Sequence, residues 1–415
     1  MKMTSRFALV AAAGMLMAVA PAKAADLGGG CCADLEERVA ELEATTARKG
    51  NRVVSLQVYG QVNKALLLWD DGFDDDAYIV DNDFSMSRLG FRGSASMKEG
   101  WTAGYHIELG IRNDSSARVD QTTDDSSDQI LIRHNNLYIE SATLGRITIG
   151  QQDTATSAIT EINLGGSHEN SYGNYSSFFI RDSTFGVGVG RIGDVQNNLN
   201  GGRANVIRYD TPSIYGFIAS ASWGEDDRYD LALRFKKEWN SIRIAAGIGY
   251  GVNEEGAAVE LDVLNPATFG VTTLGGADFV DTEVLSGSVS VMHVPTGIYG
   301  MFAAGEVEYE SDTAALDGLD GDFYYVQLGI ERRLTPYGST VFFGEYGDYQ
   351  GATAVAALFD AGTEMWGVGI TQNFDSAALQ VYASYRNYEF NSVGDDFGFP
   401  LEDFDAFLVG SKIRF

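Results

Sequence analysis

From Val53 onward the chain alternates apolar and polar residues in segments of roughly ten residues. Successive side chains of a β-strand point to opposite faces, and a strand of about ten residues with one apolar face is typical of membrane barrels. In the first segment Val58 and Val62 lie on the face predicted to meet lipid, and Gln57 and Gln61 on the face predicted to line the lumen. The 16 predicted strands lie near 55–69, 87–97, 101–110, 129–140, 144–152, 203–211, 215–223, 229–238, 241–251, 283–293, 297–309, 322–334, 339–349, 363–374, 378–389 and 405–415.

The connections between these segments alternate in length, as expected where short periplasmic turns alternate with long outer loops. One connection, of about 50 residues between Gln152 and Arg203, contains few alternating segments. A polar lumen can satisfy the backbone of so long a loop, so we expect it to fold inward and narrow the interior. The sequence therefore predicts an all-β protein, a 16-stranded antiparallel transmembrane β-barrel with a long third loop folded into the pore.

The two ends of the chain agree with this prediction. Residues 1–24 carry Lys2 and Arg6, a 14-residue apolar stretch and an Ala-Lys-Ala cleavage site, which together predict a signal peptide. After Ala25 no apolar run approaches the length of a membrane-spanning helix. The last segment alternates as far as Phe415. This is expected of a strand that closes a barrel, because lipid offers no hydrogen-bond partners to the backbone groups of an open sheet edge. We therefore expect Phe415 to act in barrel closure and assembly in an outer membrane.

Residues 25–52 are predicted to be a periplasmic linker that precedes the barrel domain, 53–415. Cys31 and Cys32 are adjacent and give no disulfide framework, which leaves a lipid anchor, an intermolecular disulfide or a small flexible cap as interpretations. Residues 34–47 show a coiled-coil pattern two heptads long. That segment is predicted to be either a trimerising helix or a marginal helix that packs locally.

The chain is strongly acidic. Its formal net charge is -29, and removal of Lys2, Arg6 and Lys23 with the signal peptide gives 26 − 58 = −32. Nucleic acid is therefore excluded as a partner, because phosphate binding requires clustered Lys and Arg. The acidity fits solvated loops that divalent cations could bridge, but the acidic stretches lack EF-hand spacing. We predict no resident metal and no cofactor.

Catalysis is not expected. The four histidines, His106, His134, His168 and His293, lie outside any nucleophile motif such as GxSxG. His106 and His134 fall on predicted neighbouring strands, where they can simply line the lumen. We predict that the protein is not an enzyme.

Several segments resemble the Gram-negative trimeric general porins: SRLGFRG, WTAGYHIELG, LGRITIGQQ and ANVIRYDTPSIYGF. NLYIES and the ending DAFLVGSKIRF are most similar to the alphaproteobacterial, Rhizobiales-type branch. The resemblance covers residues 53–415. It implies a homotrimer of barrels, each with an aqueous pore that the third outer loop constricts. It also implies outer-membrane lipids, lipopolysaccharide and the barrel-assembly machinery as partners, with ions and small hydrophilic solutes as cargo.

The resemblance further implies a pore constriction with basic residues on the wall and acidic residues on the inward loop. By position Arg88, Arg133 and Arg203 would be the wall residues, while a fourth basic position of the enterobacterial porins falls on Gln61. Arginines stay charged at any relevant pH, and opposed carboxylates create a transverse field across such an aperture.

The acidic side of the constriction is less well specified by the sequence. Many porins of this kind carry Pro-Glu-Phe-Gly-Gly in the loop, whereas this chain has EINLGGS and keeps only the two glycines. Glu161 is our first candidate for the carboxylate that faces the arginines, followed by Glu169 and Asp182.

The resulting expectation is a water-filled channel for passive diffusion, weakly cation-selective because the chain is acidic. A substrate-specific channel, for oligosaccharides or another defined solute, is the alternative. Tyr172, Tyr175, Phe178 and Phe179 in the long loop could form an aromatic slide for sugars, or equally the small core that holds the loop together.

Overall fold

The computed structural model describes most of the chain from Val53 to the C-terminus. The predictions for the signal peptide, the linker, Cys31 and Cys32 lie outside the described residues, as does the prediction for Glu169. The described residues are 53–98, 100–126, 128–167, 170, 172–225, 227–254, 258–259, 262–265, 270–273, 278–312, 316–358, 360–391 and 400–415.

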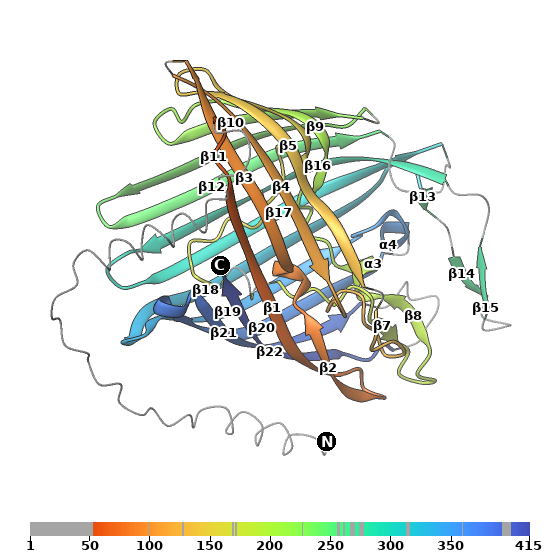
Figure 1. The fold of residues 1–415 in the computed structure, drawn as a ribbon. Helices are drawn as coiled ribbons and strands as arrows, with labels where there is room; N and C mark the ends of the chain where they lie inside the picture. Colours follow the sequence, from red (N-terminus) through yellow and green to blue (C-terminus); the bar gives the residue numbers. More distant parts are fainter. Residues whose placement is uncertain are drawn as a thin grey trace. The chain divides into compact units, whose positions relative to one another are not determined.

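Sixteen antiparallel strands in the described part of the chain form a closed ring (Figure 1). Each strand pairs with the next one along the chain, and the first pairs with the last. The strands of the ring are β1 (Gln57–Asp70), β3 (Ser87–Lys98), β4 (Trp101–Arg112), β5 (Gln129–Ser141), β6 (Gly145–Asp153), β9 (Arg203–Asp210), β10 (Phe217–Gly224), β11 (Tyr229–Trp239), β12 (Ile242–Asn253), β16 (Asp278–His293), β17 (Ile298–Ser311), β18 (Leu319–Thr335), β19 (Gly338–Gln350), β20 (Gly362–Phe374), β21 (Leu379–Phe390) and β22 (Phe404–Arg414).

The predicted fold is confirmed, because each of the 16 predicted segments overlaps one strand of the ring. The main difference in bounds is at β16, which begins at Asp278 rather than near residue 283. The period-two pattern weakens there, and the strand continues into the long connection before it.

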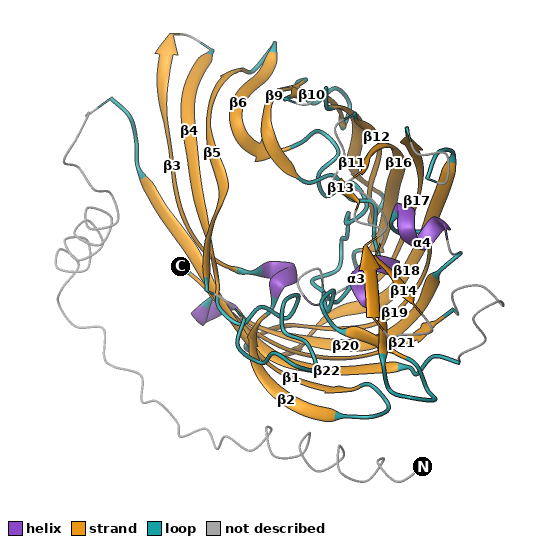
Figure 2. Ribbon diagram, turned by 90° about the vertical axis from the view of Figure 1, so that its right-hand side faces the viewer, coloured by secondary structure: helices purple, strands orange, loops and turns teal. Residues whose placement is uncertain are grey.

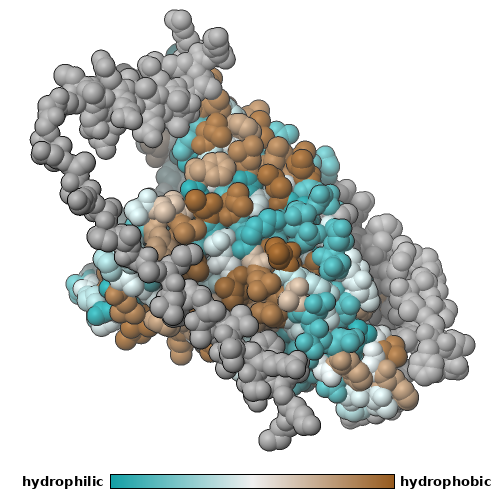
Figure 3. All heavy atoms as spheres, turned by 60° about the horizontal axis from the view of Figure 1, so that its bottom comes forward, coloured by the Kyte–Doolittle hydropathy of each residue, from teal (hydrophilic) through white to brown (hydrophobic). Residues whose placement is uncertain are grey.

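The two faces of the strands separate as the alternation predicts. On β1, Val58 and Val62 are 43% and 47% exposed, whereas Gln61 and Asn63 are 8% and 0% exposed. In Figure 3 apolar side chains spread over the visible surface, with hydrophilic ones between them. Among the described residues, no helix is both long enough and apolar enough to cross a membrane.

The ring closes at the last residue of the chain. The backbone N–H of Gly60 donates to the carbonyl of Phe415 at 3.0 Å, and the N–H of Phe415 donates back at 3.1 Å. The Phe415 ring lies over Gly60 so closely that a Cβ atom at Gly60 would stand 2.5 Å from it. A glycine is therefore required where the two ends of the barrel meet.

Shorter elements lie in the loops. β2 (Asp75–Asp81) extends the hairpin with β1, and a 3-10 helix, η2 (Asp83–Ser85), leads into β3. The remaining elements are β7 (Phe179–Arg181), β8 (Gly188–Arg191), α3 (Ile192–Val195), β13 (Ala258–Val259), β14 (Asp262–Asn265), β15 (Gly270–Thr273), α4 (Ala354–Leu358) and η4 (Asp375–Ala377).

The loop between β6 and β9, residues 154–202 and called L3 here, lies inside the ring, as predicted. The Thr156 hydroxyl donates to Asp230 on β11 at 2.6 Å. Further along L3, the amide of Asn163 donates to Gln327 on β18 at 2.7 Å. Both partners are buried side chains on the inner face. Figure 2 shows loop segments and short helices within the ring of strands.

Candidate functional site

Three arginines converge on the inner face of the β3–β9 side of the barrel. Arg88 lies on β3, Arg133 on β5 and Arg203 on β9, close enough for their charges to interact. These three residues, called the wall arginines here, are the three that the sequence predicted for the basic side of the constriction.

A β-bulge places Arg133 among them. On β4 and β5, Glu108 pairs with His134 while the next residue, Leu109, pairs with Ile132, so Arg133 is the unpaired extra residue. Such a bulge changes which face the following residues occupy. Arg133 and His134 therefore both point inward, and Leu137 returns to the outer face, 57% exposed.

Two carboxylates on the wall itself neutralise part of this charge. Glu108 on β4 pairs with Arg133 at 2.6 Å and with Arg88 at 3.6 Å. Asp153 at the end of β6 pairs with Arg203 at 2.9 Å. Sequence reasoning did not place Glu108 or Asp153, called the wall carboxylates here, beside the wall arginines. The alternation of β4 puts Glu108 on the inner face, but only the cross-strand register brings it to Arg133.

Glu161 is the predicted loop carboxylate whose charge acts on a wall arginine, Arg203. It accepts hydrogen bonds from the amides of Asn198 at 3.2 Å and Asn200 at 2.6 Å. Glu161 is thus held within L3 by neutral amide partners.

Asp182 lies elsewhere in L3, at the tip of the β7–β8 hairpin. Its carboxylate accepts from the backbone N–H groups of Thr184 and Phe185, both at 2.7 Å, and the residue is 3% exposed. It is therefore a turn-forming residue in this structure, and we leave it out of the constriction proposed below.

Gln61, which occupies the fourth basic position of the enterobacterial porins, has a structural role. Its amide donates to the carbonyl and hydroxyl of Ser85 and to the carbonyl of Met86, at 2.9, 3.0 and 3.0 Å. The side chain fixes the entry to β3 and adds no charge to the wall.

Three of the four aromatic residues predicted to form a slide in L3 belong to a core, whereas Phe179 is half-buried and its ring centre lies 4.6 Å from the Arg191 guanidinium carbon. Tyr172, Tyr175 and Phe178 are 3%, 1% and 0% exposed and belong to the largest hydrophobic cluster. The Tyr172 ring stacks on Tyr325 of β18 at 4.0 Å. Buried rings cannot offer their faces to a passing sugar, so Tyr172, Tyr175 and Phe178 act in packing rather than as a sugar slide.

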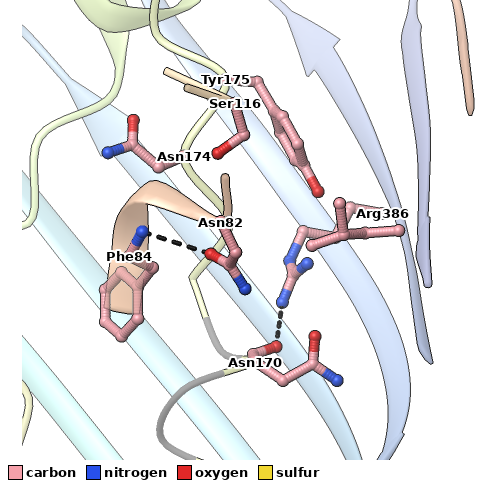
Figure 4. Close-up of a pocket in the computed structure, with 9 residues that line it drawn as sticks. Asn82, Phe84, Ser116, Asn170, Asn174, Tyr175 and Arg386 are labelled. Atoms are coloured by element: carbon pink, nitrogen blue, oxygen red, sulfur yellow. Dashed lines mark hydrogen bonds between the residues drawn. The ribbon is translucent and has the colours of Figure 1, made fainter. Parts of the chain in front are cut away.

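A buried ion pair anchors the middle of L3 to the opposite wall. Arg386 on β21 and Glu345 on β19 pair at 2.8 Å, and both side chains are almost fully buried. Glu345 accepts from the backbone N–H of Tyr172 at 3.2 Å, and Arg386 donates to the carbonyl of Asn170 (Figure 4). The cavity beside them is about 10 Å³. It has room for about one water molecule and is not a solute pocket.

The two inward histidines stack on each other. The rings of His106 and His134 are 4.3 Å apart, and His106 bonds to the Tyr59 hydroxyl. No group of three or more His, Cys, Asp or Glu among the described residues could hold a metal ion.

Two other inward arginines have a carboxylate partner. Each pairs with an aspartate on the same or a neighbouring segment. The pairs are Arg112–Asp83 at 2.9 Å and Arg208–Asp210 at 2.7 Å. These pairs neutralise part of the positive charge of the interior.

The barrel, the inward loop and the arginine wall can be compared with known proteins. A family model described as Gram-negative porin matches residues 8–395. The chain belongs to the Gram-negative porin family. It is accordingly an outer-membrane channel that crosses the membrane with its strands, and the family and fold are those of channel proteins rather than enzymes.

Solved structures agree at the level of the fold. The anion-selective porin from Comamonas acidovorans has a TM-score of 0.57 and 16% identity, with 87% of this chain and 100% of that chain covered. The trimer form of OmpT from Vibrio cholerae has a TM-score of 0.55 and 14% identity, with 88% and 100% covered. OmpF from Salmonella typhi, in complex with daunomycin, has a TM-score of 0.50 and 13% identity, with 88% and 99% covered. A comparison with curated protein sequences finds no match.

Proposed function

We propose that this porin is a general-diffusion channel for ions and small hydrophilic solutes, with weak cation selectivity. The observation that carries the proposal is the position of L3, whose side chains bond to the inner face of the ring at Asp230 and Gln327. Within L3, Glu161 is the carboxylate that we propose faces the wall arginines, and its charge acts on Arg203. Opposed charges across a water-filled aperture favour polar solutes, which exchange part of their hydration for contacts with charged groups.

The weakness and the sign of the selectivity follow from the charge distribution. Glu108 and Asp153 offset two of the three wall arginines. The chain has 58 acidic residues against 29 Lys and Arg. Because these two carboxylates offset part of the positive charge of the wall, the acidic excess of the chain is left to attract cations.

Non-specific diffusion is favoured over a substrate-specific channel because three of the four L3 aromatic rings predicted to form a slide are buried. A sugar slide needs exposed faces, and Tyr172, Tyr175 and Phe178 have almost none.

We further propose that the porin is a homotrimer of the alphaproteobacterial type, in contact with lipopolysaccharide and inserted by the barrel-assembly machinery. The OmpT structure described as a trimer form supports the first part, and the motifs NLYIES and DAFLVGSKIRF support the second.

Single-channel recording in planar bilayers tests the function. We expect conductance steps in groups of three, a small reversal potential of cation sign in a salt gradient, and no block by neutral sugars. Block by micromolar sugar would instead establish a specific channel, and an absence of conductance would refute the proposal. Unboiled gels test the trimer, which a monomer band alone would contradict.

A further inference from the structure

A second group of arginines lies beyond the wall arginines, toward the short turns. A cavity of about 510 Å³ opens there on the inner face. Most of its lining comes from the parts of β3, β5, β6 and β9 that lead to short turns. It includes Arg92, His106, Tyr138, Arg146 and Arg208.

The cavity continues the same side of the lumen. Arg92 follows Arg88 by four residues on the same face of β3, which corresponds to about 13 Å along the strand. Asp153 lines the cavity and also pairs with Arg203. A solute that passes the wall arginines therefore meets this cavity next.

Two of the cavity arginines are held in place by tyrosine rings. The Arg146 guanidinium carbon lies 3.7 Å from the centre of the Tyr138 ring, and that of Arg92 lies 5.1 Å from the centre of the Tyr59 ring. An arginine stacked on an aromatic face is fixed in orientation, while its N–H edge stays available for hydrogen bonds.

Their hydrogen bonds leave donors free. Within the described residues, Arg92 donates from Nε to Gln57 at 2.9 Å and has no carboxylate in ion-pair distance. Arg146 has a single ion pair, to Glu140 at 3.5 Å, where both side chains are partly exposed. The terminal nitrogens of both guanidinium groups thus remain available to a solute.

Arg208 shows the contrasting arrangement in the same cavity. Its guanidinium donates to Asp210 and to the carbonyls of Asp153 and Thr154. The two carboxylates of the cavity are also engaged, Asp210 by Arg208 and Asp153 by Arg203. Arg92 consequently has no carboxylate partner in the described part of the chain, and Arg146 has only the longer pair to Glu140. The charges of both arginines act on His106, as do those of Glu108 and Asp153.

We propose that Arg92 and Arg146 form an oxyanion subsite in the lumen that transiently binds small organic anions bearing a phosphate or carboxylate group. This inference rests on the proposed channel function. Each guanidinium group has the planar fork geometry that binds the paired oxygens of such anions. The stacked histidines and the tyrosine rings add a flat surface for the rest of the solute.

Block of single-channel current by glucose 6-phosphate, compared with glucose, tests the subsite. We expect millimolar glucose 6-phosphate to interrupt the current of the wild-type porin, and glucose to leave it unchanged. The Arg92→Gln/Arg146→Gln variant should weaken the block by roughly tenfold or more, as expected for the loss of two charge-assisted contacts. Arg243→Gln is the matched control, because that arginine lies at the start of β12, outside the cavity, and pairs across the strands with the exposed Glu238 at the end of β11.

The outcomes separate the subsite from the channel function. Equal block in the double variant and the wild type, or equal effects of glucose and its phosphate, would overturn the subsite and leave the channel intact. Absence of wild-type conductance would overturn both. A third experiment measures block by inorganic phosphate. Block by phosphate alone would support the subsite and show that the anionic group is sufficient for binding. The two single variants are recorded as well. Heat-modifiable gel mobility of every variant checks that altered block does not reflect a misfolded barrel.

Discussion

Glu108 is the residue on which the charge of the arginine wall depends most directly. Its carboxylate serves Arg133 and Arg88 together and also accepts from the Tyr59 hydroxyl at 2.7 Å. Its side chain is 5% exposed, so it is covered by its partners and does not contact solutes in the pore. Its negative charge therefore acts on passing ions through the electrostatic potential of the pore, and not by direct binding.

We expect Glu108→Gln to shift the permeability ratio of potassium to chloride toward chloride by roughly threefold to tenfold. The amide keeps the shape and can still accept from Arg133, but the two arginines lose their counter-charge. Reversal potentials in a potassium chloride gradient measure the shift. Glu364→Gln, on the exposed face of β20, is the control with the same charge change. An equal reversal potential in both variants would refute this role.

Asp71 links the outer end of β1 to L3 and gives that link a pH dependence. It pairs with Arg181 at 2.9 Å and is 2% exposed. Burial opposes ionisation, but the N–H of Asp74, the Arg181 guanidinium and the N–H of Phe73 outweigh it and hold the pKa of Asp71 below its ordinary value.

A lowered folded-state pKa stabilises the structure above the unfolded-state pKa, near 4, and this contribution is lost as the pH falls through the folded-state value. We expect Asp71→Asn to lower the free energy of unfolding by about 1–2 kcal/mol at neutral pH and by progressively less below about pH 4. Urea unfolding across this range measures the difference. Asp312→Asn, at an exposed loop position, should show no such trend.

At the scale of the element, L3 is held by its contacts with the wall. The Arg386–Glu345 pair is buried and contacts the L3 backbone at Asn170 and Tyr172. Removing one partner leaves a buried charge without its counter-ion, which typically costs about 3–5 kcal/mol.

We therefore expect Arg386→Met to loosen L3, with noisier channels and faster proteolysis within the loop. The double variant Arg386→Met/Glu345→Gln should recover much of the loss, because no unpaired charge remains. Recordings and limited proteolysis check both. A single variant as quiet and resistant as the wild type would show that L3 does not depend on the pair.

The elements themselves could be predicted from the sequence because barrel strands must alternate. The bulge left a readable signal, since Ile130 and Ile132 have one parity and Leu137 and Ile139 the other. The path of L3 left no such signal in the sequence, because hydroxyl and amide side chains such as those of Thr156 and Asn163 can bond to almost any polar wall. For the same reason the sequence could rank Glu161 and Asp182 only by position.

At the scale of the whole molecule, the contact between Gly60 and Phe415 completes the pairing of β1 with β22 that closes the barrel. A Cβ at Gly60 would stand 2.5 Å from the Phe415 ring and 2.6 Å from the Arg88 carbonyl oxygen. The backbone oxygen cannot move aside without disturbing the β1–β3 pairing.

We expect Gly60→Ala to reduce the yield of folded, heat-modifiable barrel several-fold. Gly202→Ala is the control, because nothing lies within 4 Å of a Cβ there. Equal yields of the two variants on unboiled gels would show that the closure tolerates the extra methyl group.

The bulge at Arg133 also makes the pore easy to alter by mutation. Loss of that one codon would restore regular alternation from Ile132 through His134 to Leu137, with every lipid-facing residue still facing lipid. A single in-frame deletion would thus remove one positive charge from the constriction while sparing the wall. Insertions and deletions usually disrupt the alternation of a β-strand. At this bulge, a single deletion would instead change the charge of the pore constriction and leave the alternation intact.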